Sequence, residues 1–100
     1  MTTMAERLDR ARSQIDRALE EVRSDSGASP VLLAVVTEFA SKAEKAVGLS
    51  DQRTAIIELE QAGDSAKAAV EADRGASPAS RAAVIEAHQL ICMAKGKLET

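Results

Sequence analysis

His88 is the only histidine of the chain, and histidine is the side chain best suited to proton or phosphoryl transfer near neutral pH. Arg81 and Lys95 lie one heptad before and one heptad after it, so all three side chains fall on one edge of a helix. A row of nitrogen-bearing side chains of this kind can hold a phosphoryl group or another anion. The row Arg81, His88 and Lys95 is therefore the first candidate site.

In one respect this row resembles histidine phosphotransfer domains, which are four-helix bundles with a phosphorylated histidine in the middle of a helix. The motif of that family has a lysine three residues after the histidine and a glycine directly after the lysine. Ile91 and Cys92 occupy those two positions here, so the resemblance does not extend beyond the histidine. Phosphotransfer or anion binding through His88 remains an alternative to a histidine at the border of the core.

Metal chemistry is the second candidate, because Glu38 and Glu86 occupy equivalent positions in two halves of the chain. Diiron bundles use Glu-x-x-His pairs on facing helices, whereas Glu86 and His88 are two residues apart and point about 200° apart on a helix. No second histidine completes a site. We expect both glutamates to be solvated, Cys92 to behave as a small buried hydrophobe, and no metal or cofactor to bind.

The composition argues against several other functions. Acidic and basic residues are interspersed along the chain rather than gathered into blocks, the net charge is −3, and one Phe is the only aromatic residue, so the sequence predicts no nucleic-acid surface. No glycine-rich phosphate loop and no catalytic triad is evident, so we expect neither an enzyme nor a small-molecule substrate. The longest apolar run, residues 31–36, is far shorter than the ~20 residues that cross a bilayer. A single cysteine and a polar amino-terminal segment favour a cytoplasmic protein.

An internal repeat organises the chain. Gly27-Ala28-Ser29-Pro30 recurs as Gly75-Ala76-Ser77-Pro78, 48 residues later. The same offset aligns further pairs, among them Leu8 with Ile56, Val22 with Val70, Asp25 with Asp73, Val36 with Val84 and Gly48 with Gly96. A period of this length is typical of a helical hairpin.

Each copy of the repeated motif predicts the end of one helix and the start of the next. Glycine supplies a left-handed residue that ends a helix, serine caps the following helix, and proline stands at its first position. Gly48-Leu49-Ser50 has the same role between the copies, with Leu49 packing back on the preceding turn. These signals predict helices at about 3–26, 30–47, 51–74 and 78–98.

The predicted fold is all-α, an up-down-up-down antiparallel four-helix bundle built from two repeated helical hairpins, residues 3–47 and 51–98, in one domain spanning residues 1–100. Short links make consecutive helices antiparallel neighbours. Helices one and three have narrow apolar seams, and Gly63 within the third is expected to have a packing reason. Helices two and four have broad apolar faces, which in helix two include Leu33.

Four apolar residues do not fit into one bundle core, and they define a tentative interaction surface: Val31, Ile57, Ile85 and Met93. Large apolar patches on small proteins usually bind something. We therefore expect a non-enzymatic protein-interaction or oligomerisation module. Its partner is a protein or a second copy of the chain, with a homodimer formed mainly through helices two and four.

Overall fold

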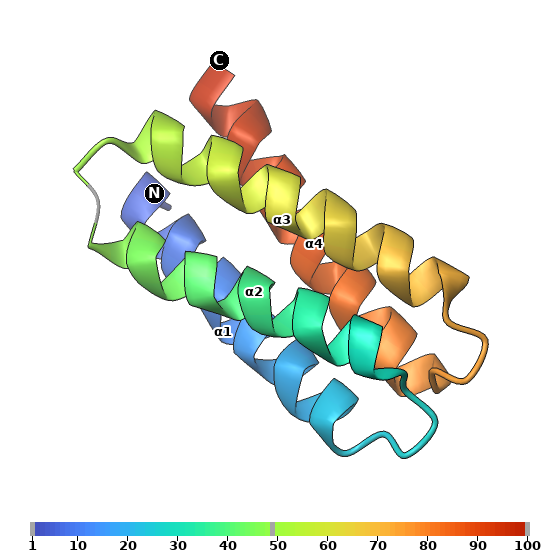
Figure 1. The fold of residues 1–100 in the computed structure, drawn as a ribbon. Helices are drawn as coiled ribbons and strands as arrows, with labels where there is room; N and C mark the ends of the chain where they lie inside the picture. Colours follow the sequence, from blue (N-terminus) through green and yellow to red (C-terminus); the bar gives the residue numbers. More distant parts are fainter. Residues whose placement is uncertain (1, 49, 100) are drawn as a thin grey trace.

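Four antiparallel helices make up the structure, a computed structural model that describes residues 2–48 and 50–99 (Figure 1). They are α1 (Met4–Arg23), α2 (Pro30–Val47), α3 (Gln52–Ala72) and α4 (Pro78–Glu99), and the described residues contain no strand. Each helix packs mainly against two others, α1 and α3 both lying between α2 and α4. The predicted up-down-up-down four-helix bundle is confirmed.

The core is built almost wholly from aliphatic side chains. Phe39, Val36 and Val84 are fully buried, and Ala, Val, Leu and Ile supply most of the remaining buried residues. Among residues 2–48 and 50–99, the single buried polar side chain is that of Ser80. Small side chains allow the helices to approach closely, and the bundle measures 38 × 20 × 18 Å.

Serine and aspartate side chains cap the N-terminal ends of α2, α3 and α4. Ser29 Oγ accepts a hydrogen bond from the amide of Leu32, and Ser77 Oγ accepts one from the amide of Ser80, both at 3.1 Å. Both serines therefore cap as predicted, with a proline directly after each. At α3 the predicted cap Ser50 is wrong, because Asp51 Oδ1 accepts the amides of Arg53 and Thr54. Leu49 lies outside the described residues.

The two glycine loops differ from the prediction in their backbone conformation. No described glycine has a positive φ, so the left-handed residue predicted at Gly27 and Gly75 is wrong. The helices before them also end earlier than predicted, at Arg23 and Ala72. The glycines are required for another reason: a Cβ on Gly27 would lie 3.1 Å from the carbonyl carbon of Gly75 and closer still to its oxygen, and the reverse holds for Gly75.

Each loop also caps a helix of the other hairpin. Asp25 Oδ2 accepts hydrogen bonds from the amide of Ser77 at 2.7 Å and from Ser80 Oγ at 2.8 Å, while Asp73 Oδ2 accepts the amide of Ser29 at 2.8 Å. The Ser77 amide, helped by the Ser80 hydroxyl, lowers the pKa of Asp25 to about 2, and the Ser29 amide lowers the pKa of Asp73. The contacts are reciprocal, so a local two-fold axis relates the two loops.

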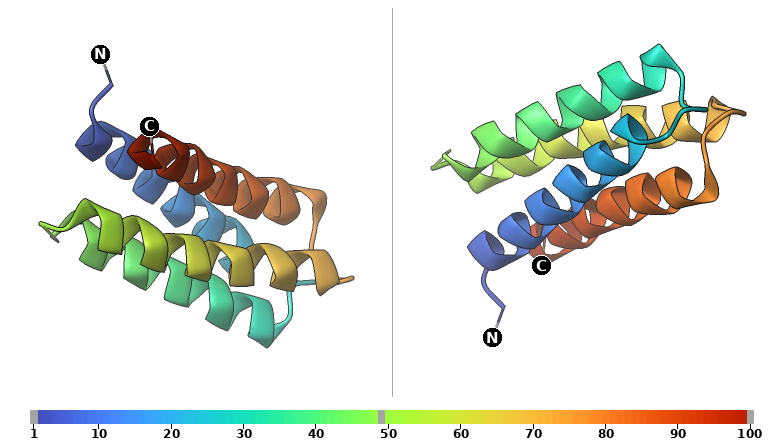
Figure 2. Two further views of the ribbon diagram at one scale, coloured as in Figure 1. Left: turned by 90° about the horizontal axis from the view of Figure 1, so that it is seen from above. Right: turned by 90° about the horizontal axis from the view of Figure 1, so that it is seen from below.

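This arrangement fixes which parts of the chain share an end of the bundle. The loops containing Gly27 and Gly75 lie together at one end, and the start of α1 and the end of α4 lie at the other end with the end of α2 and the start of α3 (Figure 2). Because α2 and α4 stand at diagonal corners, they cannot form one continuous face. A dimer face that includes both of these helices must therefore also include α1 or α3, since one of them always lies between α2 and α4, and the dimer itself stays a prediction.

Candidate functional site

His88 lies in the seam between α3 and α4. Its Nε2 atom is 2.6 Å from Asp64 Oδ1, and its side chain is 13% exposed whereas that of Asp64 is 63% exposed. Gly63 makes room for this ring, because a Cβ there would lie 3.2 Å from His88 Cδ2 and 3.2 Å from Phe39 Cζ. The expected packing reason for Gly63 is confirmed: its missing side chain admits two rings.

Acceptor groups from α3 and the loop after it already bind all three side chains of the row, Arg81, His88 and Lys95. Arg81 donates to the backbone carbonyls of Asp73 and Ala76, and Lys95 Nζ lies 2.9 Å from Glu60 Oε2. Successive members of the row are seven residues apart, about 10.5 Å along the helix. An incoming anion would meet the carboxylate of Asp64 or Glu60 beside the cation, which opposes its binding.

Cys92 lies one turn beyond His88, on the exposed side of the helix. Its Sγ atom is 3.8 Å from Nδ1 and 3.7 Å from Nε2 of His88. Because these distances are nearly equal, they do not identify either nitrogen as the acceptor of the thiol proton. Partial desolvation of the Cys92 sulfur by its neighbours raises the pKa of the thiol, and the charges of Glu60 and Asp64 raise it further. The neutral thiol, a poor nucleophile, is thereby favoured. The prediction of a buried Cys92 is wrong, since the residue is exposed.

The two equivalent glutamates lie on separate helices at opposite corners of the bundle. Glu38 lines a hollow between α2 and α3, whereas Glu86 accepts a hydrogen bond from Gln14 on α1. Both are exposed, as predicted. Within residues 2–48 and 50–99, no group of His, Cys, Asp and Glu side chains could hold a metal ion.

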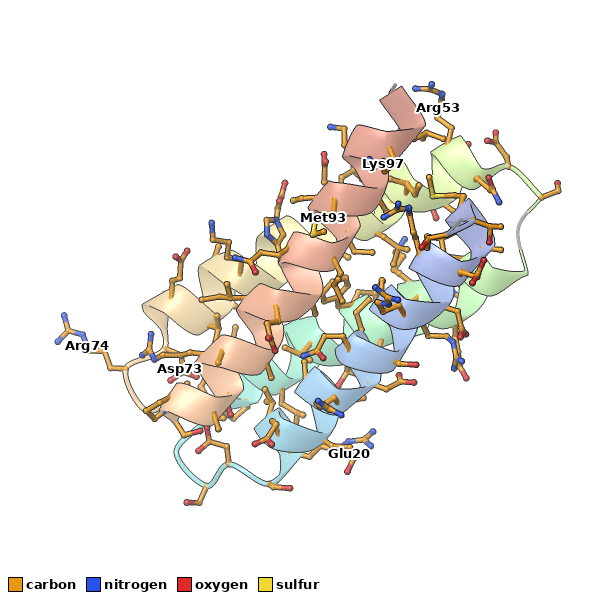
Figure 3. The ribbon with its side chains drawn as sticks, turned by 180° about the vertical axis from the view of Figure 1, so that it is seen from behind. Glu20, Arg53, Asp73, Arg74, Met93 and Lys97 are labelled. Carbon is orange, nitrogen blue, oxygen red and sulfur yellow. The ribbon has the colours of Figure 1, made fainter. Side chains whose placement is uncertain are left out.

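The apolar residues left out of the predicted core lie on different surfaces. Val31 is 68%, Ile57 43% and Met93 59% exposed, and Figure 3 shows Met93 on the outward side of α4. Ile85 instead packs partly against the core. Leu33, predicted in the broad core face of helix two, is 37% exposed, because that face is narrower than the sequence pattern suggested.

A larger apolar feature is the hollow between α2 and α3, on the side that Figure 1 shows nearest the viewer. We call it the α2–α3 furrow. Its first part, about 400 Å³, is lined by Ala34, Val35, Glu38, Lys42, Glu58, Gln61, Ala62 and Ser65. Its second part is a separate hollow of about 490 Å³ farther along the same two helices toward the glycine loops, which shares no lining residue with the first; Val31, Ala69 and Ala72 are among its lining residues.

The seam between α1 and α4 occupies the equivalent place in the other half of the repeat, and it has a different surface. There Gln14, Glu21 and Ser24 replace Ala62, Ala69 and Ala72 of the furrow. Gln14 lies across the seam and donates to the carbonyl oxygen of Ala83 at 3.3 Å. The hollows along this seam have volumes of about 180 and 30 Å³.

Sequence reasoning did not identify the furrow, because its alanines read as ordinary helix formers. The available signal was the difference between the repeat copies, in which Gln14 and Glu21 become Ala62 and Ala69.

Comparison with known proteins adds no functional assignment: no protein-family model, curated protein or solved structure matches the chain. Among the described residues, no helix combines the length and the apolar character needed to cross a membrane.

Proposed function

We propose that this chain is a non-enzymatic protein-interaction module that also associates with itself as a homodimer. The observation that carries the proposal is the apolar surface left outside a complete core. Val31 and Met93 are more than half exposed, although the bundle already buries Val36, Val84 and Phe39 fully. Exposed apolar surface of this kind supports an interface where it forms a contiguous patch with its neighbours.

The outward side of α4 supports self-association best. Met93 is 59% exposed there, and Ile85, two turns earlier on the same helix, is only partly buried. A two-fold pairing of α4 with its copy would bury both residues, and two-fold dimers are the commonest assemblies of identical chains. As part of the same proposal, the protein acts in the cytoplasm, where the lone thiol of Cys92 stays reduced.

Light scattering combined with size-exclusion chromatography tests the homodimer. We expect a dimer at micromolar concentration and a folded monomer after the double replacement Ile85→Lys and Met93→Lys. Circular dichroism checks that the variant keeps its helices. A parent protein that remains strictly monomeric at the highest attainable concentration would reject self-association.

The alternative function, phosphotransfer through His88, predicts a different result. Acetyl phosphate would modify an accessible histidine, whereas the interaction module is indifferent to His88→Gln. The short contact with Asp64 and the 13% exposure of the His88 side chain favour the interaction module. We expect no modification at His88, as measured by mass spectrometry under conditions that preserve phosphohistidine.

A further inference from the structure

The α2–α3 furrow is more apolar than the fold requires, and the chain itself supplies the comparison. The α1–α4 seam joins the two hairpins in the same way, yet it has Ala79 and Ala83 where the furrow has Val31 and Val35. Val31 is 68% exposed, so it contributes little to the core. Because the α1–α4 seam closes with alanine at these two positions, the exposed surface of Val31 and Val35 is available for binding.

We propose that the furrow binds one amphipathic helix of a partner protein, about three turns long, with basic residues on both sides of its apolar stripe. The inference rests on the proposed function as an interaction module, and it specifies the surface and the class of partner. It does not depend on the homodimer, because Ile85 and Met93 lie on α4, away from the furrow.

The dimensions of the furrow fit a single helix. From Val31 to Lys42 its α2 wall extends about 17 Å at 1.5 Å per residue, which a helix of roughly 12 residues covers. A groove between two antiparallel helices accepts a third helix through apolar side chains spaced at i, i+3 or i+4, and i+7. The small side chains of Ala34 and Ala62 in the wall let the backbone of that helix approach closely.

A second copy of the chain fits this surface less well. A stable interface buries about 800 Å² of accessible surface on each partner, whereas the furrow extends over less than half of the 38 Å length of the bundle. A copy docked here would therefore need surface well beyond the furrow. A single helix needs only the furrow.

The charges along the furrow select a basic helix. Asp73 and Arg74, one residue of each sign, line the second part of the furrow. In the first part, Glu38 on α2 and Glu58 on α3 line opposite walls, with Lys42 as the single basic residue there. Among the described residues, none of these three side chains has an ion-pair partner within 4.0 Å. In the equivalent α1–α4 seam, Arg10 replaces Glu58, so that seam lacks a pair of glutamates facing each other across the two walls.

A synthetic peptide of about 14 residues serves as the probe, with leucines at helical spacing along one face and lysines on both flanks. A matched peptide has glutamate in place of lysine. Titration of the full-length protein, followed by amide chemical shifts in NMR spectra, should perturb residues 31–42 and 58–72 with the lysine peptide. The glutamate peptide should bind at least about tenfold more weakly.

Two pairs of variants use the repeat as an internal control. Val31→Ser should weaken binding about tenfold, whereas Ala79→Ser, the same replacement at the equivalent position of the other copy, should leave the affinity within about twofold. Glu38→Lys should abolish the preference for the lysine peptide. Glu86→Lys, which changes the net charge equally at the equivalent position, should preserve it.

The outcomes separate this inference from the homodimer. Failure of the lysine peptide to bind at millimolar concentration would overturn the inference, as would shifts centred on α1 and α4 or equal effects of Val31→Ser and Ala79→Ser. The double variant Ile85→Lys and Met93→Lys should still bind the peptide. A monomeric parent that binds it would reject the homodimer and support the furrow, and a dimer that does not bind would do the opposite.

Discussion

Replacing Gly27 with alanine tests the close approach of the two glycine loops. The added Cβ would lie 3.1 Å from the carbonyl carbon of Gly75 and closer to its oxygen, well inside the 3.5–4.0 Å separation at which carbon atoms attract. Asp25 and Asp73 accept cross-hairpin hydrogen bonds that hold both loops in place. Neither loop can therefore move away from the other without lengthening these hydrogen bonds. Overpacking of this kind costs about 1 to 3 kcal/mol.

The effect is measured by thermal and urea unfolding, followed by circular dichroism. For a domain of this size each kcal/mol corresponds to about 4 to 8 °C in Tm, so Gly27→Ala should lower Tm by at least about 4 °C. Gly75→Ala should behave alike, because its Cβ would meet Gly27 at the same distance. The double variant should lose less stability than the two single variants together, since the first added Cβ already separates the loops.

Gly96 provides the matched control, because a Cβ at this position in α4 meets nothing within 4 Å. Gly96→Ala should stabilise the protein by roughly 0.5 to 1 kcal/mol, the helix-propensity difference between the two residues. If Gly27→Ala melted at or above the parent temperature while Gly96→Ala gave this gain, the two loops would not be in contact and the reasoning would be refuted.

Two further predictions concern the loops and the core. The pKa of Asp25 is lowered from 3.8 to about 2 in the folded chain, so the stability that its ionised form contributes is complete above about pH 4 and is lost as the pH falls toward 2. Asp25→Asn should remove this part of the acid sensitivity, as measured by Tm against pH, and an unchanged profile would exclude Asp25 as its source. Val36→Asp and Val84→Asp should each abolish cooperative melting, because both side chains are 0% exposed and a charge there has no partner. A parent-like melt of either variant would place that residue outside the core.

The sequence predicted the elements well because their signals are local. Serine followed by proline defines the start of a helix through neighbouring backbone amides, so the beginnings of α2 and α4 were predicted at the observed residues. The apolar spacing that placed Val36 and Val84 in the core is likewise contained within single helices.

The errors arose where a residue acts across the fold. Gly27 was interpreted as a left-handed helix end, but its role depends on Gly75, which only the packed hairpins bring near. Asp25 and Asp73 were matched by the repeat, yet nothing local reveals that each caps a helix of the opposite hairpin.

The row of Arg81, His88 and Lys95 was placed correctly on one edge of a helix. Its acceptors Asp64 and Glu60 come from α3, and one helical wheel cannot show them. The α2–α3 furrow was missed for the same reason, since it exists only between two helices.

The first helix starts and the last helix ends at the same end of the bundle, which has a consequence for the order in which the helices can follow one another along the chain. The start of α1 and the end of α4 belong to adjacent antiparallel helices, and they lie at the same end of the bundle as the α2–α3 link (Figure 2). A short linker joining the termini, with new ends opened between α2 and α3, gives the circularly permuted order α3, α4, α1, α2. The cross-hairpin contacts of Asp25, Asp73, Gly27 and Gly75 involve neither the α2–α3 link nor the chain ends, so we expect the permuted chain to keep them.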